Sequence, residues 1–70
     1  PYQLKARVSE IESDIATLET ELETVTTAIE TESSNGRADK VIALSVRYSE
    51  IETALEAAME EWSELAEHVE

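Results

Sequence analysis

The chain has 70 residues, with 17 acidic side chains against 5 Lys and Arg residues, which gives a formal net charge of -12. With one Gly, one Pro and no Cys, it excludes a many-turned β-sandwich, a Gly-rich phosphate loop, a disulfide scaffold and a thiolate zinc site. The negative charge disfavours direct binding to nucleic-acid phosphates and to anionic lipid surfaces. No apolar run approaches the roughly 20 residues that span a bilayer, and the chain begins with Pro1 rather than Met. We therefore expect a segment of a longer protein, with no membrane contact.

Apolar residues in the first half recur every three or four positions without a break. This spacing is that of a heptad repeat, in which the apolar a and d positions line one face of a helix. The a positions are Val8, Ile15, Leu22 and Ile29, and the d positions are Leu4, Ile11, Leu18 and Val25. The pattern predicts a helix over about residues 3–32.

The second half shows the same repeat. Its a positions are Val41, Tyr48, Leu55, Trp62 and Val69, and its d positions are Leu44, Ile51, Ala58 and Leu65. The pattern predicts a second helix over about residues 39–69, with Asp39 as a plausible N-cap.

A short polar stretch separates the two repeats. Ser33, Ser34, Asn35 and Gly36 form the only turn-rich cluster in the sequence, and Gly36 can adopt the left-handed conformation that ends a helix. A loop over about residues 33–38 is short enough to make the two helices antiparallel. The predicted fold is all-α, a single two-helix antiparallel coiled-coil hairpin over residues 1–70.

Charged residues beside the apolar positions give an independent indication of register. When the chain is folded at the loop, the facing g positions bring Arg7 to Glu61 and Glu21 to Arg47, two pairs of opposite charge. Exposed pairs of this kind contribute only about 0–1 kcal/mol each, so they favour this register without determining it.

The e positions are different because they carry like charges. Glu19 faces Glu52 in the same register, and each of them also has a second acid four residues on, at Glu23 and Glu56. Acids at this spacing repel each other on a helix surface. We therefore expect a salt-sensitive hairpin that relies on a partner, a second copy or its parent protein.

The sequence IESDIATLE at residues 11–19, the polar loop, and the sequence MEEWSEL at residues 59–65 together resemble the C-terminal coiled-coil domain of ABC-F ATPases. The resemblance implies a soluble, cytoplasmic parent with two ATP-binding cassettes, linked to the ribosome and translation, to antibiotic resistance or to DNA. ATP and Mg would belong to that parent. The chain has no G-x-x-x-x-G-K-[ST] motif, and we assign it no catalytic, cofactor-binding or metal-binding residue.

Two aromatic side chains are candidates for packing or for interaction. Trp62 is interpreted as a core anchor at an a position, covering Val8 and Ala58, and the alternative is an exposed aromatic hot spot for a protein partner. Tyr48 is interpreted in the same way, with its hydroxyl group reaching the rim.

Two cations, Arg37 and Lys40, lie at the predicted tip of the hairpin. A tip with two positive charges could contact RNA phosphate groups. The nearby acids Glu30, Glu32 and Asp39 largely cancel that charge, so we favour a tip that does not bind nucleic acid.

Catalysis is not expected, because a two-helix hairpin has no pocket in which to desolvate paired carboxylates. His68 lacks the Glu-x-x-His and H-E-x-x-H spacings of metal sites. We expect a non-catalytic interaction module that positions its parent ATPase on the ribosome, on nucleic acid or on a protein partner. The alternatives are a nucleic-acid-probing helical arm and a structural or homodimerising hairpin of an unrelated protein.

Overall fold

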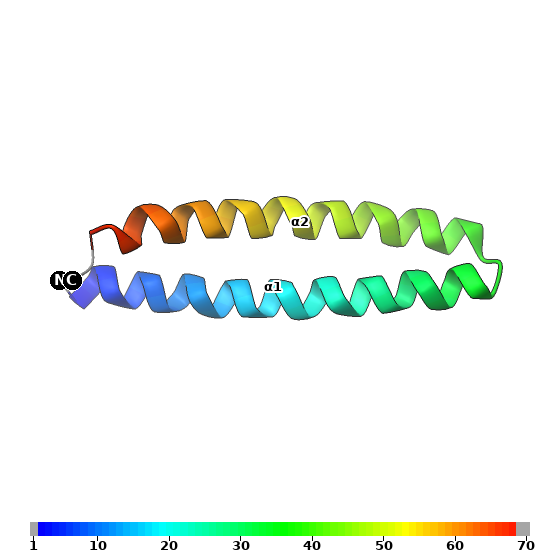
Figure 1. Ribbon diagram of the computed structural model, residues 1–70, viewed down its shortest axis with the longest axis horizontal. Coiled ribbons are helices and arrows are strands. Elements are labelled where there is room, and N and C mark those ends of the chain that lie inside the picture. Colours follow the sequence, from blue (N-terminus) through cyan, green and yellow to red (C-terminus); the bar gives the residue numbers. More distant parts are fainter. Residues whose placement is uncertain (1, 69–70) are drawn as a thin grey trace.

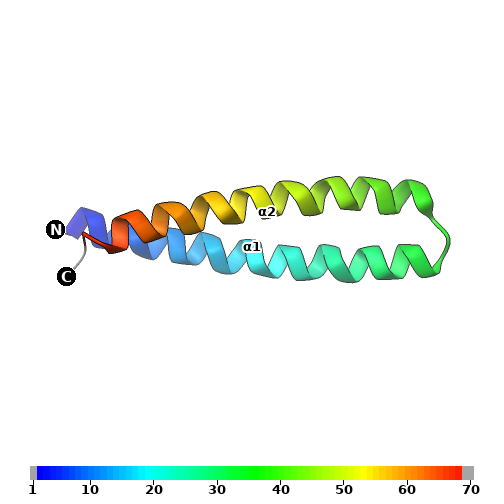
Figure 2. The same cartoon turned by 45° about the horizontal axis from the view of Figure 1, so that its top comes forward.

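The chain folds into a hairpin of two long helices (Figure 1). The computed structural model describes residues 2–68, with α1 at Tyr2–Ser34 followed by α2 at Ala38–Ala66. The helices lie side by side in a body 52 Å long and 14 by 13 Å across, and the start of α1 lies beside the end of α2, as Figures 1 and 2 both show. The prediction of an all-α, antiparallel two-helix hairpin is confirmed.

The helix ends differ from the predicted ranges by a few residues. α1 begins at Tyr2 and continues to Ser34, and α2 begins at Ala38 and ends at Ala66, after which residues 67–68 form a turn. The predicted helical residue Val69 lies outside the described residues. The prediction that Asp39 caps α2 is wrong, because Arg37 occupies the N-cap position without a side-chain cap. Asp39 lies in the first turn instead, where its charge is favourable to the helix dipole.

Gly36 ends α1 through a Schellman motif. The N–H of Arg37 donates to the carbonyl of Glu32 at 3.0 Å, and the N–H of Gly36 donates to the carbonyl of Ser33 at 3.1 Å. Gly36 has a φ of 70°, which is the left-handed conformation that this motif requires and that Gly adopts without steric cost. The chain therefore reverses over three residues, 35–37.

Gly36→Ala is expected to destabilise the hairpin by roughly 1 kcal/mol, the cost of a left-handed alanine. A Cβ atom at Gly36 would meet nothing within 4 Å, so the loss comes from the backbone alone. Urea denaturation followed by circular dichroism measures it. Gly36→Asn is the control and should cost less, because Asn tolerates the left-handed region. Equal losses for the two variants would contradict this explanation.

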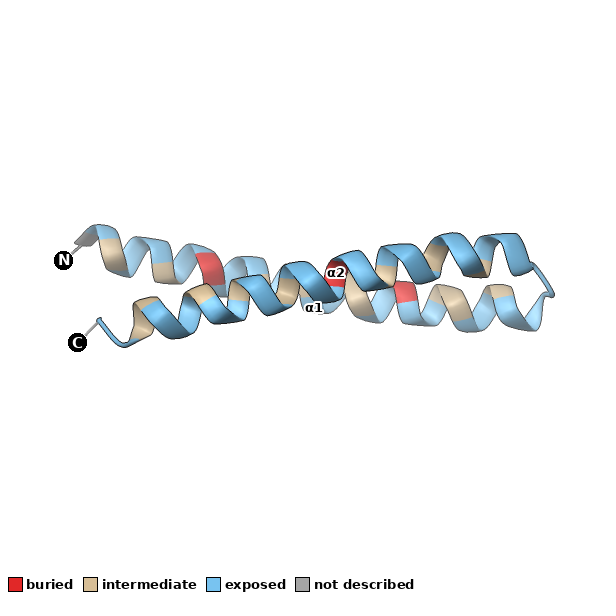
Figure 3. Ribbon diagram, turned by 90° about the horizontal axis from the view of Figure 1, so that it is seen from above, coloured by how far each residue is buried: buried red, intermediate tan, exposed pale blue. Residues whose placement is uncertain are grey.

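The core is confined to one row of the heptad repeat (Figure 3). The buried residues among those described are Ile11, Val25 and Ile51, and all three occupy d positions. Ile11 and Ile51 are each 1% exposed. The a positions from Val8 to Leu55 are half-buried, and so are the other d positions, Leu4, Leu18, Leu44, Ala58 and Leu65.

Candidate interaction surface

One side of the hairpin, which we call the g side, is closed by ion pairs between the helices. The g side consists of the heptad g positions, Arg7, Asp14, Glu21 and Ala28 of α1 with Lys40, Arg47, Ala54 and Glu61 of α2. The guanidinium group of Arg7 donates to Glu61 through Nε at 3.1 Å and Nη2 at 3.0 Å. Arg47 donates to Glu21. Both pairings are those predicted from the register.

Each arginine also holds an acid on its own helix. Arg7 contacts Glu10 at 2.7 Å, and Arg47 lies 3.7 Å from Glu50. Hydrogen bonds to Glu61, and then to Glu10, raise the pKa of Arg7 above its usual value. Arg7 therefore keeps its charge at any pH at which the protein is handled, and the pair it makes does not depend on pH through the arginine.

Arg47→Glu is expected to destabilise the hairpin by about 1 kcal/mol, since it places two acids at facing g positions and removes an exposed ion pair. The exchanged pair Glu21→Arg with Arg47→Glu should recover most of the loss. Thermal denaturation of the four proteins of this double-mutant cycle gives the coupling free energy. A double variant no more stable than Arg47→Glu would show that the g side does not contribute to the register.

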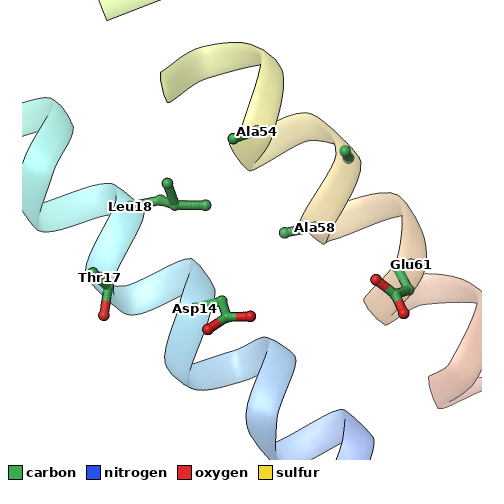
Figure 4. A pocket seen from close by; sticks show the side chains of 7 residues that line it. Asp14, Thr17, Leu18, Ala54, Ala58 and Glu61 are labelled. Atoms are coloured by element: carbon green, nitrogen blue, oxygen red, sulfur yellow. The ribbon is translucent and has the colours of Figure 1, made fainter. Parts of the chain in front are cut away.

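Between these two ion pairs the g side has a shallow hollow (Figure 4). Leu18 and Asp14 of α1 reach toward Ala54 and Ala58 of α2 there. No ion pair among residues 2–68 involves Asp14, because its facing g position is Ala54 rather than a cation. Small alanine side chains leave the hollow open to solvent, and it contains no polar group aimed into it besides the exposed acids.

The opposite side of the hairpin, which we call the e side, is open. The e side consists of the heptad e positions, Lys5, Glu12, Glu19, Thr26 and Ser33 of α1 with Ser45, Glu52, Met59 and Ala66 of α2. No ion pair among the described residues crosses it. The a positions lie next to this side on the helix surface, and those from Val8 to Leu55 are half-buried. The d positions lie next to the g side, and three of them, Ile11, Val25 and Ile51, are buried.

Trp62 lies at the edge of the e side rather than in the core. The prediction that it is a buried core anchor is wrong, because the residue is 38% exposed. Its Nε1–H donates to Oε2 of Glu12 at 3.1 Å, and its ring lines an open hollow with Ile15 and Met59. The indole N–H needs a polar partner, which the Glu12 carboxylate at an e position provides. The indole ring is also too large to be enclosed at an a position that lies beside the open e side.

Tyr48 occupies the corresponding place nearer the tip. It is half-buried and lines a second open hollow with Ile29, Thr26 and Ser45. Ile42, three residues before Ser45, continues this apolar surface outward and is 67% exposed. Periodicity alone did not distinguish the two sides, and Ile42, Met59 and the Glu12 carboxylate were missed as parts of this surface.

The two predicted tip cations do not form a free positive patch. Arg37 lies 3.5 Å and Lys40 lies 3.9 Å from the carboxylate of Glu32, whose side chain is 15% exposed. Both cations thus lie close to the half-buried Glu32 carboxylate at the end of α1 and offset its charge. Among the residues that the structure describes, no group of three His, Cys, Asp or Glu side chains is placed to hold a metal ion.

Comparison with known families assigns the chain to one of them. The family model described as the ABC transporter C-terminal domain matches residues 1–67. The chain belongs to this family. Neither the comparison with curated proteins nor that with solved structures gave a match. No helix within residues 2–68 is both long enough and apolar enough to cross a membrane. Membership of an ABC protein family sets aside the alternative of a hairpin from an unrelated protein.

Proposed function

We propose that this ABC transporter C-terminal domain is a non-catalytic coiled-coil interaction module of an ABC-F-type ATPase. It positions the ATP-binding parent on its target, the ribosome or nucleic acid, or on a protein partner, in the cytoplasm. ATP and Mg would bind to the parent's cassettes and not to this hairpin. The observation that carries the proposal is the family match over residues 1–67 on a hairpin whose hollows between the helices, in the part of the chain that the structure describes, are open to solvent.

The shape of the hairpin supports a role in contact rather than in chemistry. Its two ends are 52 Å apart, so it can carry a contact far from the domain to which it is joined. The carboxylates lie along exposed helix faces, whereas paired-acid catalysis needs a concave, desolvated site. Met59 and Trp62 are exposed apolar side chains that line one open hollow together, and exposed apolar patches mark protein–protein contact sites.

Two experiments test the proposal in the longer protein. The reading frame that contains the chain should encode two ATP-binding cassettes, and their absence would contradict the ABC-F assignment. Removal of residues 1–70 from that protein should leave ATP hydrolysis intact but reduce its association with the target in co-sedimentation. Loss of ATP hydrolysis in the deletion protein would instead point to a role within the cassettes.

The nucleic-acid-probing arm is the competing function. Such an arm needs a basic face, and the cations at the tip are both engaged by Glu32. Titration of the chain with duplex DNA and duplex RNA at low salt separates the two functions. Tight binding that falls steeply with salt would favour the arm, and the absence of binding favours the interaction module.

A further inference from the structure

The charges of the hairpin are divided unequally between its two sides. Of the cations in the two helices, Arg7, Lys40 and Arg47 occupy g positions, and Lys5 occupies an e position near the start of α1. Arg7 and Arg47 make ion pairs with acids of the facing helix. From residue 12 to residue 30 and from residue 42 to residue 63, the charged residues of the e side and of the b positions beside it are all acidic. These acids are Glu12, Glu19, Glu23, Glu30, Glu52 and Glu56.

The apolar surface of the e side is divided into two hollows. One hollow is lined by Trp62, Met59 and Ile15, and the other by Tyr48 and Ile29. Trp62 and Tyr48 are 14 residues apart on α2, which corresponds to about 21 Å along the helix axis.

The acids between the hollows are not neutralised within the hairpin. The e positions of the first hollow are Glu12 and Met59, and those of the second are Thr26 and Ser45. The layer one heptad from each is Glu19 with Glu52, and no ion pair in the described chain involves either acid. Two like charges that face each other without a counterion repel, and a positive partner would remove that repulsion.

We propose that the e side binds a basic amphipathic helix of a protein partner, which lies in the groove between α1 and α2. Its apolar residues, two heptads apart, fill the two hollows, and Lys or Arg residues between them meet Glu19 and Glu52. Helices of this kind bind grooves through apolar anchors at helical spacing. The inference rests on the proposed function, since it names the surface and the class of partner of that interaction module.

Charge identifies this occupant over the others. A second copy of the chain would bring another net charge of -12 against the same acidic side, and nucleic acid would bring phosphates. A basic helix alone supplies both the apolar residues and the opposite charge. The partner helix needs about 22 residues to reach both hollows with one turn at either end.

The single tryptophan of the chain provides the assay, because Trp62 lies in one of the hollows. The probe is a synthetic 21-residue helical peptide without Trp. It has a leucine near each end, the two leucines two heptads apart, and lysines between them. Its binding should shift the emission of Trp62 to shorter wavelength and weaken with salt. A peptide with alanine in place of leucine, and a peptide of equal composition with the leucines brought together, should each bind at least about tenfold more weakly.

Matched variants locate the binding surface. Glu19→Gln with Glu52→Gln should weaken binding by roughly fivefold to tenfold. Asp14→Asn with Glu64→Gln removes the same charge from the other side, relieves a similar i, i+4 repulsion on each helix, and should change the affinity by less than about twofold.

Met59→Ala should weaken binding, whereas Val46→Ala, also at an exposed apolar residue, should not. Circular dichroism at 222 nm confirms that each variant is folded.

Four results would overturn the proposal: no binding, equal binding of the alanine peptide, equal effects of the two charge variants, or an unchanged Trp62 emission on binding. A chain that sediments as a dimer with Trp62 already covered, or duplex RNA that shifts the Trp62 emission, would assign the surface to another occupant.

The deletion experiment on the full-length protein is independent of the peptide. If deletion weakens target association but the peptide does not bind, only the e-side proposal fails.

Discussion

Ile11→Ala and Ile51→Ala are each expected to destabilise the hairpin by about 2–5 kcal/mol, the range for buried isoleucine replaced by alanine. Both side chains are 1% exposed, so each substitution removes apolar contacts and leaves a cavity that the two helices cannot fill by collapse. Small domains of this size rarely hold more than about 3–5 kcal/mol of stability. Either substitution should therefore convert much of the helix signal at 222 nm to that of an unfolded chain at 25 °C.

The control is Ile42→Ala, which makes the same chemical change at a residue that is 67% exposed. It should alter the free energy of unfolding by less than about 0.5 kcal/mol. Ile51→Val provides a graded variant that stays folded, with an expected loss of about 0.5–1.5 kcal/mol. Similar losses at Ile42 and Ile51 would show that the core does not lie along the d positions.

Trp62→Ala is expected to cost about 2 kcal/mol, which is below the range of about 3–5 kcal/mol for a fully buried tryptophan. The residue is only partly covered, so its removal exposes less apolar surface of Ile15 and Met59 than removal of a core residue would. It also leaves the Glu12 carboxylate without the Nε1–H donor at 3.1 Å. Urea denaturation followed by circular dichroism measures the loss.

Trp62→Phe separates the two contributions, because it keeps an aromatic ring and removes the donor. A loss below about 1 kcal/mol is expected, since the carboxylate of Glu12 is exposed and water can replace the indole N–H. A loss as large as that of Trp62→Ala would mean that the hydrogen bond, and not the ring, holds this end of the hairpin together. Glu12→Gln keeps an acceptor at this position, so it should be nearly neutral in either case.

Much of the fold could be predicted because the signals are local and redundant. The unbroken 3.5-residue spacing defines two helices, and Gly36 marks the reversal between them, where a φ of 70° is needed. The g-position charges then indicate one register, in which Arg7 meets Glu61 and Arg47 meets Glu21. Helix ends were less predictable, since the N-cap of α2 proved to be Arg37 with no side-chain cap.

The candidate surface was harder to predict because it depends on how the two helices are rotated about their axes. The heptad pattern treats a and d positions alike, and on that basis Trp62 is as much a core residue as Ile51. Its interpretation as a core anchor failed for this reason. The alternative of an exposed aromatic hot spot agrees better with its 38% exposure and with the hollow it lines.

The amino-acid sequence by itself determined the helices, their reversal and their register, because helix periodicity, a left-handed glycine and paired charges act between near or symmetrically placed residues. Only the tertiary structure decided which side of the interface closes. The ion pairs of Arg7 and Arg47 join the two helices on the g side, whereas no ion pair among the described residues crosses the e side. That difference arises from the rotation of the two packed helices about their axes, which the heptad pattern of the sequence does not specify.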